Sequence, residues 1–76
     1  MKKIYVVLQE IEDEFHIFEF PHVIHENNPF IKLASPIYKK AEDFAKKLSS
    51  AFLCEYEVEG ERLVNGVLLK EFNLEI

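Results

Sequence analysis

The pair Asn65-Gly66 lies between two runs rich in apolar and β-branched residues, and it predicts a β-hairpin over residues 54–76. Asparagine and glycine both tolerate the positive φ of a type I′ turn, so the turn is expected at these two positions. Counting outward from the turn places Val64 opposite Val67. This hairpin is the frame into which the rest of the chain must fit.

Gly60 is predicted to form a β-bulge in the same hairpin. Without an extra residue, the apolar Phe72 would lie opposite Glu59. One extra residue at Gly60 shifts the register by one and places Val58 opposite Phe72, so that the apolar residues share a face. Two further pairs follow from this register: Tyr56 with Leu74, and Cys54 with Ile76.

Residues 3–11 and 15–20 are predicted to form a second hairpin, joined across residues 12–14. A three-residue connection pairs apolar residues with one another, for example Val6 with Phe20. Both faces of these strands are apolar, a pattern typical of strands that are covered on two sides.

A helix is predicted to begin at Ser35, which is a good N-cap, followed by Pro36, which suits the first helical position. Before it, residues 21–34 contain two prolines that break regular structure, and residues 30–33 are expected to form a short strand or an anchored loop. The apolar residues of the helix recur at helical spacing and form one stripe: Ile37, Ala41, Phe44, Ala45 and Leu48.

The chain is therefore expected to fold as a single small α+β domain over residues 1–76. The predicted order ββαββ gives an antiparallel β-sheet of about four strands with one α-helix packed on one face. A chain of this length buries only about 60% of its unfolded surface, so its core is small.

One helix can cover only one face of this sheet, which leaves an apolar face to be covered by something else. Three covers are compatible with the sequence: a second copy of the chain, a target protein, or the loop of residues 21–34. The residues expected to bind a partner on this face and near the hairpin turn are Tyr5, Val7, Phe15, Ile17, Val64, Val67 and Leu69.

Three carboxylates form an acidic row on the predicted hairpin: Glu55, Glu57 and Glu59. Alternation along a strand places them on one face at intervals of about 6.7 Å. This spacing is compatible with a mimic of the nucleic-acid backbone that blocks a DNA- or RNA-binding protein. The solvated face of an antiparallel strand alternates in the same way, and it is the preferred interpretation because a strong mimic would carry more net charge.

Two other groups of residues suggest alternative functions. Lysines on the polar side of the helix (residues 39, 40, 46 and 47) could contact nucleic acid, although a solvated helix face also explains them. His22, His25 and Glu26, with His16 nearby, could hold a metal, but they lack the spacing of known helical metal motifs. No metal and no cofactor are therefore expected.

Composition favours a protein partner over nucleic acid or a membrane. The net charge of −5 disfavours general binding to phosphates, and no segment approaches the ~20 apolar residues of a membrane span. Cys54 is the single cysteine, which suits a reducing, cytoplasmic setting. No catalytic motif is present, so no enzymatic activity is expected.

The sequence thus predicts a small acidic binding module that docks on another protein, on itself as a homodimer, or on both. Its size and charge resemble those of small regulators or inhibitors, including the kind that phages encode.

Overall fold

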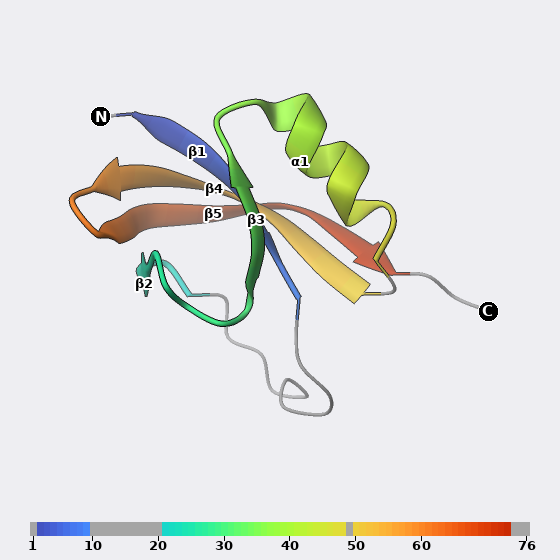
Figure 1. Ribbon diagram of the computed structural model, residues 1–76, viewed down its shortest axis with the longest axis horizontal. Helices are drawn as coiled ribbons and strands as arrows, with labels where there is room; N and C mark the ends of the chain where they lie inside the picture. Colours follow the sequence, from blue (N-terminus) through green and yellow to red (C-terminus); the bar gives the residue numbers. More distant parts are fainter. Residues whose placement is uncertain (1, 10–20, 49, 74–76) are drawn as a thin grey trace.

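The computed structural model describes residues 2–9, 21–48 and 50–73. In these residues the chain forms a five-stranded sheet and one helix (Figure 1). The elements are β1 (Lys3–Leu8), β2 (Ile24–His25), β3 (Ile31–Ser35), α1 (Tyr38–Ala45), β4 (Ser50–Glu59) and β5 (Arg62–Asn73). The strand order is β2-β5-β4-β1-β3, and all neighbours are antiparallel.

The predicted α+β class, with one helix and an antiparallel sheet, is confirmed. The described sheet has five strands instead of about four, and three of them precede the helix. β2 and β3 lie at opposite edges of the strand order, yet only residues 26–30 connect them. This short connection suits the curl of the sheet, which brings the β2 and β3 edges toward each other (Figure 1).

The turn between β4 and β5 is formed by Gly60 and Glu61, and Asn65-Gly66 does not form it. Glu59 pairs with Arg62 across this two-residue connection. Gly60 has φ +63°, which glycine adopts without the steric cost that a β-carbon would bring. The predicted position of the hairpin turn is therefore wrong by five residues.

Asn65 and Gly66 instead form an irregularity inside β5, where the two residues lie opposite the single residue Tyr56. Asn65 has φ 53°, a conformation that asparagine tolerates better than most residues. The bulge and the turn have thus exchanged places relative to the prediction. The observed partners in β4 differ as follows: Val58 pairs with Leu63 instead of Phe72, Cys54 pairs with Leu68 instead of Ile76, and Tyr56 faces the bulge instead of Leu74.

β1 lies between β3 and β4, so both of its edges are occupied. Val6, for example, pairs with Ala34 on one side and with Cys54 on the other. The predicted pairing of Val6 with Phe20 is therefore wrong. Residues 10–20, which include the rest of the predicted first hairpin, lie outside the described residues.

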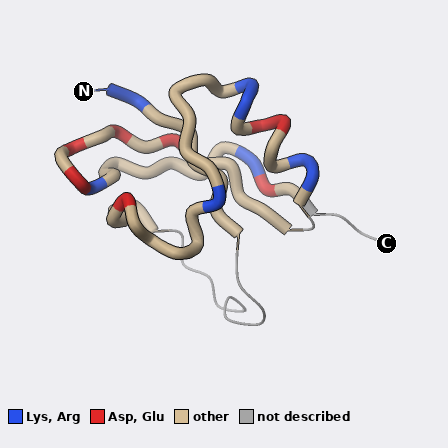
Figure 2. The backbone as a smooth tube through the Cα atoms, viewed as in Figure 1, with Lys and Arg blue, Asp and Glu red and all other residues tan. Residues whose placement is uncertain are grey.

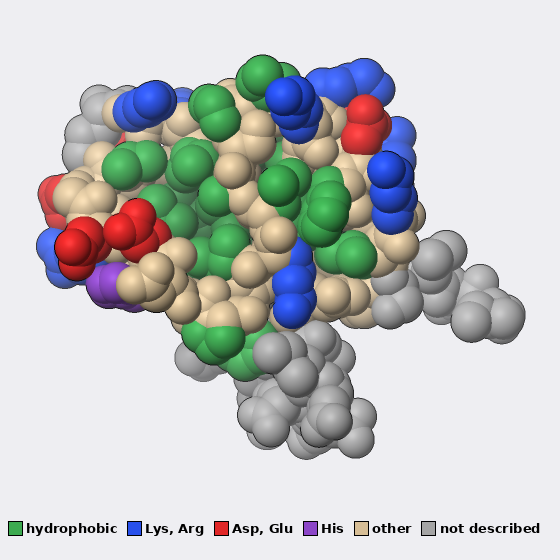
Figure 3. Space-filling view, viewed as in Figure 1, with side chains coloured by type: hydrophobic (Ala, Val, Ile, Leu, Met, Phe, Trp, Pro, Cys, Tyr) green, Lys and Arg blue, Asp and Glu red, His purple; other side chains and the backbone are tan. Residues whose placement is uncertain are grey.

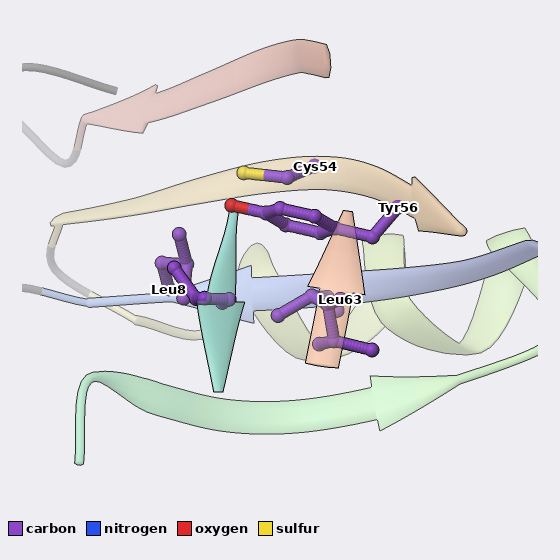
Figure 4. Close-up of a cluster of buried hydrophobic side chains, with 6 residues drawn as sticks. Leu8, Cys54, Tyr56 and Leu63 are labelled. Atoms are coloured by element: carbon purple, nitrogen blue, oxygen red, sulfur yellow. The ribbon is translucent and has the colours of Figure 1, made fainter. Parts of the chain in front are cut away.

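One face of the curled sheet holds an inner cluster of buried residues: Val6, Leu8, Ile24, Cys54, Tyr56 and Leu63. Figure 4 shows four of these side chains in the space between β4 and β3. The Tyr56 hydroxyl is the polar group of this cluster, and it donates a hydrogen bond of 2.6 Å to the Pro21 carbonyl. The segment before β2 is thereby fixed to the sheet.

The other face packs against α1 through a helix-side cluster: Val7, Ala41, Ala45, Ala51 and Leu53. Val7 is completely buried there, and Tyr5 is half-buried beside it. The expectation that Tyr5 and Val7 lie on an uncovered face is therefore wrong, because the helix covers that part of the sheet. Phe15 and Ile17, expected on the same face, lie outside the described residues.

α1 begins later than predicted. Ser35 is the last residue of β3, and its Oγ accepts a hydrogen bond of 3.0 Å from the Ile37 N–H in place of capping the helix. Of the predicted stripe, Ala41 and Ala45 are buried, whereas Ile37 is 49% exposed. None of the helices in the described part of the chain has the length and apolar character needed to cross a membrane.

Candidate protein-binding surface

Two valines of β5 lie directly across from two glutamates of β4. The register pairs Glu57 with Val64 and Glu55 with Val67. Opposite residues of an antiparallel pair place their side chains on the same face, with Cβ atoms about 4.5–5.5 Å apart. An apolar stripe and an acidic stripe therefore run side by side, and we call this the valine–glutamate surface (Val64 and Val67 with the acidic row).

This surface is on the face of the sheet that α1 covers elsewhere. Alternation along β4 places the acidic row on the same side as Leu53, which packs under the helix. The helix lies over the half of the sheet remote from the β4–β5 turn (Figure 1). No described helix covers the half nearer the turn, where Val67 remains 50% exposed and Val64 is half-buried.

Each carboxylate of the acidic row has a partner in the chain. The pairs are Glu55 with Lys3 (3.7 Å between Oε1 and Nζ), Glu57 with the Asn65 amide (2.6 Å) and Glu59 with Arg62 (2.9 Å). The Glu57–Asn65 bond depends on the bulge, which holds Asn65 beside β4. Exposed ion pairs contribute little to stability, so these contacts orient the carboxylates without removing them from water.

The charges of the molecule are separated in space. The hairpin of residues 50–73 carries five acidic and two basic side chains. Figure 2 shows acidic residues gathered at the turn end of the hairpin and lysines along the helix. A partner approaching the valine–glutamate surface therefore meets a negative potential.

Three consecutive apolar residues of β5 are exposed to different degrees: Val67 (50%), Leu68 (42%) and Leu69 (39%). Leu69 was predicted in the binding set, and it lies at a second irregularity in the β4–β5 register. Leu68 was missed, because the predicted turn placed it in the apolar interior. A usable signal was present in the sequence, since three consecutive apolar residues cannot all face one side of a strand.

Figure 3 shows hydrophobic side chains gathered beside β3 and bordered by acidic side chains at the hairpin end. The residues that pack at the margin of the inner cluster are all half-buried: Ile4, Phe30, Ile31, Phe52 and Val58. Their partial burial distinguishes them from the three exposed residues of β5.

The thiol of Cys54 is fully buried, and burial raises its pKa from 9.0 to about 12. Burial also raises the pKa of the Tyr56 hydroxyl, and the neighbouring Cys54 adds to the effect. Both groups therefore stay protonated at neutral pH. A protonated, inaccessible thiol is a poor nucleophile, so Cys54 acts as a small core residue.

The histidines that suggested a metal site are held by other contacts. His22 Nδ1 lies 3.0 Å from the Gly66 carbonyl oxygen, and His25 Nε2 lies 3.6 Å from a carboxylate oxygen of Glu61. No three potential ligands come together anywhere in the part of the chain that the structure describes. His16 lies outside those residues.

The helix lysines face solvent, and Lys39 pairs with Asp43 at 3.4 Å. Glu42 is bound by Lys70 from β5, at 2.7 Å. The hydrogen bond from Lys70 lowers the pKa of Glu42, and the same bond raises the pKa of Lys70. This contact ties the helix to the sheet and points the Lys70 ammonium toward α1.

Comparison with known proteins gives no relative from which a role could be inferred. No protein-family model, no curated protein and no solved structure matches this chain.

Proposed function

We propose that this protein is a small, non-enzymatic binding module that docks on another protein through the valine–glutamate surface. The observation that carries the proposal is the register of β4 and β5, which sets the half-exposed Val67 directly across from Glu55. An apolar centre bordered by charges is the usual anatomy of a recognition surface. The complementary partner is a basic protein surface with an apolar residue that contacts Val64 and Val67.

The proposal assigns no chemistry to the protein. Cys54 is buried and protonated, and the histidines at positions 22 and 25 are engaged in contacts within the fold. A regulator or inhibitor acting in the cytoplasm fits these features, since such proteins work by occupying a surface of their target. A second copy of the chain, bound through the same surface, is the other partner to test.

Affinity capture with matched variants tests the proposal. The wild-type protein is used to capture partners from the cells that produce it, and a captured partner is then purified and titrated by calorimetry. Val67→Ser removes the exposed apolar contact, whereas Ile37→Ser removes a similarly exposed apolar side chain from the start of the helix. We expect about tenfold weaker binding for Val67→Ser and unchanged binding for Ile37→Ser.

A second pair of variants tests the contribution of the acidic charges to binding. Glu57→Gln keeps an oxygen that can accept the Asn65 hydrogen bond but removes the charge, and Asp43→Asn removes a charge from the helix. Binding should weaken for Glu57→Gln, and this effect should shrink as salt rises, because exposed charges are screened within about 10 Å at 0.1 M salt. A partner that binds all four variants as well as the wild type would overturn the proposal.

A further inference from the structure

The outer edge of β5, defined here as the free side of residues 67–72, is a stretch of backbone to which the described structure gives no neighbour. β5 pairs with β4 along its length, but β2 pairs with it only at Arg62 and Leu63. The Gly66 N–H then donates a hydrogen bond of 2.9 Å to the His22 carbonyl. Beyond Gly66, no described residue pairs with this side of the strand.

The two edges of the sheet are protected very differently. Edge strands usually avoid unwanted pairing by being short or by carrying charges and prolines. β3 has only five residues, exposes Lys32 and is followed by Pro36. β5 has no proline, and its one lysine, Lys70, is bound to Glu42 on the helix. The outer edge of β5 is longer than β3 and has no proline, and the features that oppose strand addition there are the irregularity at Leu69 and the exposed charge of Glu71. It is therefore less protected than the edge formed by β3.

The side chains along this edge favour an apolar contact on both faces of an added strand. Val67, Leu68 and Leu69 are each more than a third exposed. Neighbouring residues of a strand point to opposite faces, so a strand added here would cover apolar surface on each side of the sheet. Peptide recognition by strand addition uses this combination of free backbone groups and alternating side-chain contacts.

The charges around the edge favour a partner that carries basic side chains. The two basic residues of the hairpin are already paired, Arg62 with Glu59 and Lys70 with Glu42. Glu71 is exposed and has no ion pair among the described residues. A cation opposite Glu71 would be favourable, whereas a second copy of this chain would bring another net charge of −5.

We propose that the outer edge of β5 takes up an extended, cationic segment of the partner protein as an additional strand. This inference rests on the proposed function, because it specifies how the partner docks beside the valine–glutamate surface. The added strand would contact Val67 and could place a basic side chain beside the exposed Glu71.

Hydrogen exchange and peptide titration on the full-length protein test this proposal. The probe is the six-residue peptide acetyl-(Val-Lys)3-amide, and the matched control is acetyl-(Val-Glu)3-amide. In the free protein, alternate amides of residues 67–72 should exchange rapidly, because their N–H groups face the open edge. Adding the cationic peptide should protect these amides, and it should bind at least tenfold more tightly than the acidic peptide at low salt.

Backbone methylation distinguishes strand addition from simple charge attraction. Two versions of the cationic peptide carry N-methyl groups, either on all three valines or on all three lysines. Only one of these sets can face β5, so one version should bind and the other should lose binding. Leu69→Lys should weaken the unmodified peptide about tenfold, while Ile37→Lys, which alters an exposed residue of similar size on the helix, should not.

Several results would overturn the proposal. Equal binding of both methylated peptides, or no binding of any cationic peptide, would exclude an added cationic strand. Protection of the edge amides in the free protein would mean that the edge is already occupied. Sedimentation would then show whether the occupant is a second copy or another part of the same chain. A partner that binds in the capture experiment and depends on Val67 would still support the proposed function in each of these cases.

Discussion

The two halves of β5 both carry apolar residues but have different surroundings. In the first half, Leu63 is 4% exposed and Gly66 is buried, with β4 on one side and the β2 segment on the other. In the second half, Val67 and Leu68 are exposed by 50% and 42%, with β4 as the one described neighbour. Both halves contain leucine and valine. The strands on either side, and not composition, decide which half forms the core and which stays exposed.

The boundary between the halves is the bulge at Asn65 and Gly66. A β-carbon at Gly66 would lie 2.4 Å from Cε1 of Tyr56, so only glycine allows the tyrosine ring to pack there. The same position holds the segment before β2 through His22, whose carbonyl and ring nitrogen both contact the backbone of Gly66. Gly66 therefore makes room for the Tyr56 ring and anchors the segment before β2 against the buried half of the strand.

The largest expected effect comes from breaking this boundary. Gly66→Ala should destabilise the protein by about 3 kcal/mol, because the new methyl group overlaps a ring that is fully buried. Gly60→Ala is the matched control. Its β-carbon meets nothing within 4 Å, so it costs only the strain of positive φ, about 1–2 kcal/mol. Urea unfolding measures both, and equal losses would show that the bulge can relax around a methyl group.

The next effect concerns the hydrogen bond that fixes the segment before β2. Tyr56→Phe should lower the free energy of unfolding by about 1–2 kcal/mol, since it leaves the Pro21 carbonyl without its 2.6 Å donor. Tyr38→Phe removes a hydroxyl whose contact with Glu42 is long, 3.4 Å, and exposed. Thermal unfolding should therefore separate the two variants. A loss as large for Tyr38→Phe would contradict the distinction between buried and exposed hydroxyls.

A smaller effect should appear as the pH rises. The pKa of Cys54 is about 12 in the folded protein and 9.0 when the thiol is in water. Between these values the unfolded thiol ionises while the folded one stays protonated, so stability falls with rising pH. The loss from Cys54 should be on the order of 1 kcal/mol at pH 10.

Cys54→Ala should remove this part of the pH dependence, which urea titrations at pH 8 and pH 10 would measure. In the wild type, alkylation by iodoacetamide should be slow until the protein unfolds, because the thiol is inaccessible as well as protonated. Rapid alkylation under native conditions would mean that the inner cluster opens readily.

The smallest effect on stability is expected in the exposed half of β5. Val67→Ser should change the free energy of unfolding by less than about 0.5 kcal/mol, as for most surface substitutions. Leu63→Ala, in the buried half, is the contrast and should cost about 2–5 kcal/mol. If Val67→Ser destabilised the protein as strongly as Leu63→Ala, the outer half would be part of the core and unavailable to a partner.

The sequence was sufficient to predict the elements that depend on local pattern. The spacing of Ala41 and Ala45 identifies the buried side of the helix, and strand alternation places the acidic row on one face. The hairpin turn was mispredicted because Gly60-Glu61 and Asn65-Gly66 both have residues suited to a turn. What separates them is the space that Tyr56 needs opposite Gly66, and this is a packing requirement between strands.

The neighbours of β1 could not be predicted for a related reason. Both faces of this strand are apolar, so alternation does not reveal which strands flank it. Its partners, β3 and β4, lie far away in the sequence. For the candidate site, the sequence placed the valines and the acidic row in one hairpin, but the predicted pairing of Val64 with Val67 is wrong, and their pairing with glutamates depends on the observed turn. Three consecutive apolar residues signal that one of them lies outside the core, but the exposure of Leu68 in particular depends on where β2 ends.

The position of β1 at the interior of the sheet has a consequence for biosynthesis. Of the described strands, β1 leaves the ribosome first, whereas β4, which flanks one of its edges, follows only after β3 and α1. β3 can pair with one edge of β1 once residue 35 has left the exit tunnel, but the other edge stays unpaired until the residues of β4 have left it. Long-range pairing of this kind folds slowly and exposes aggregation-prone surface in the meantime. Nascent chains of this protein should consequently depend on rapid completion of translation or on chaperones that shield the first strand.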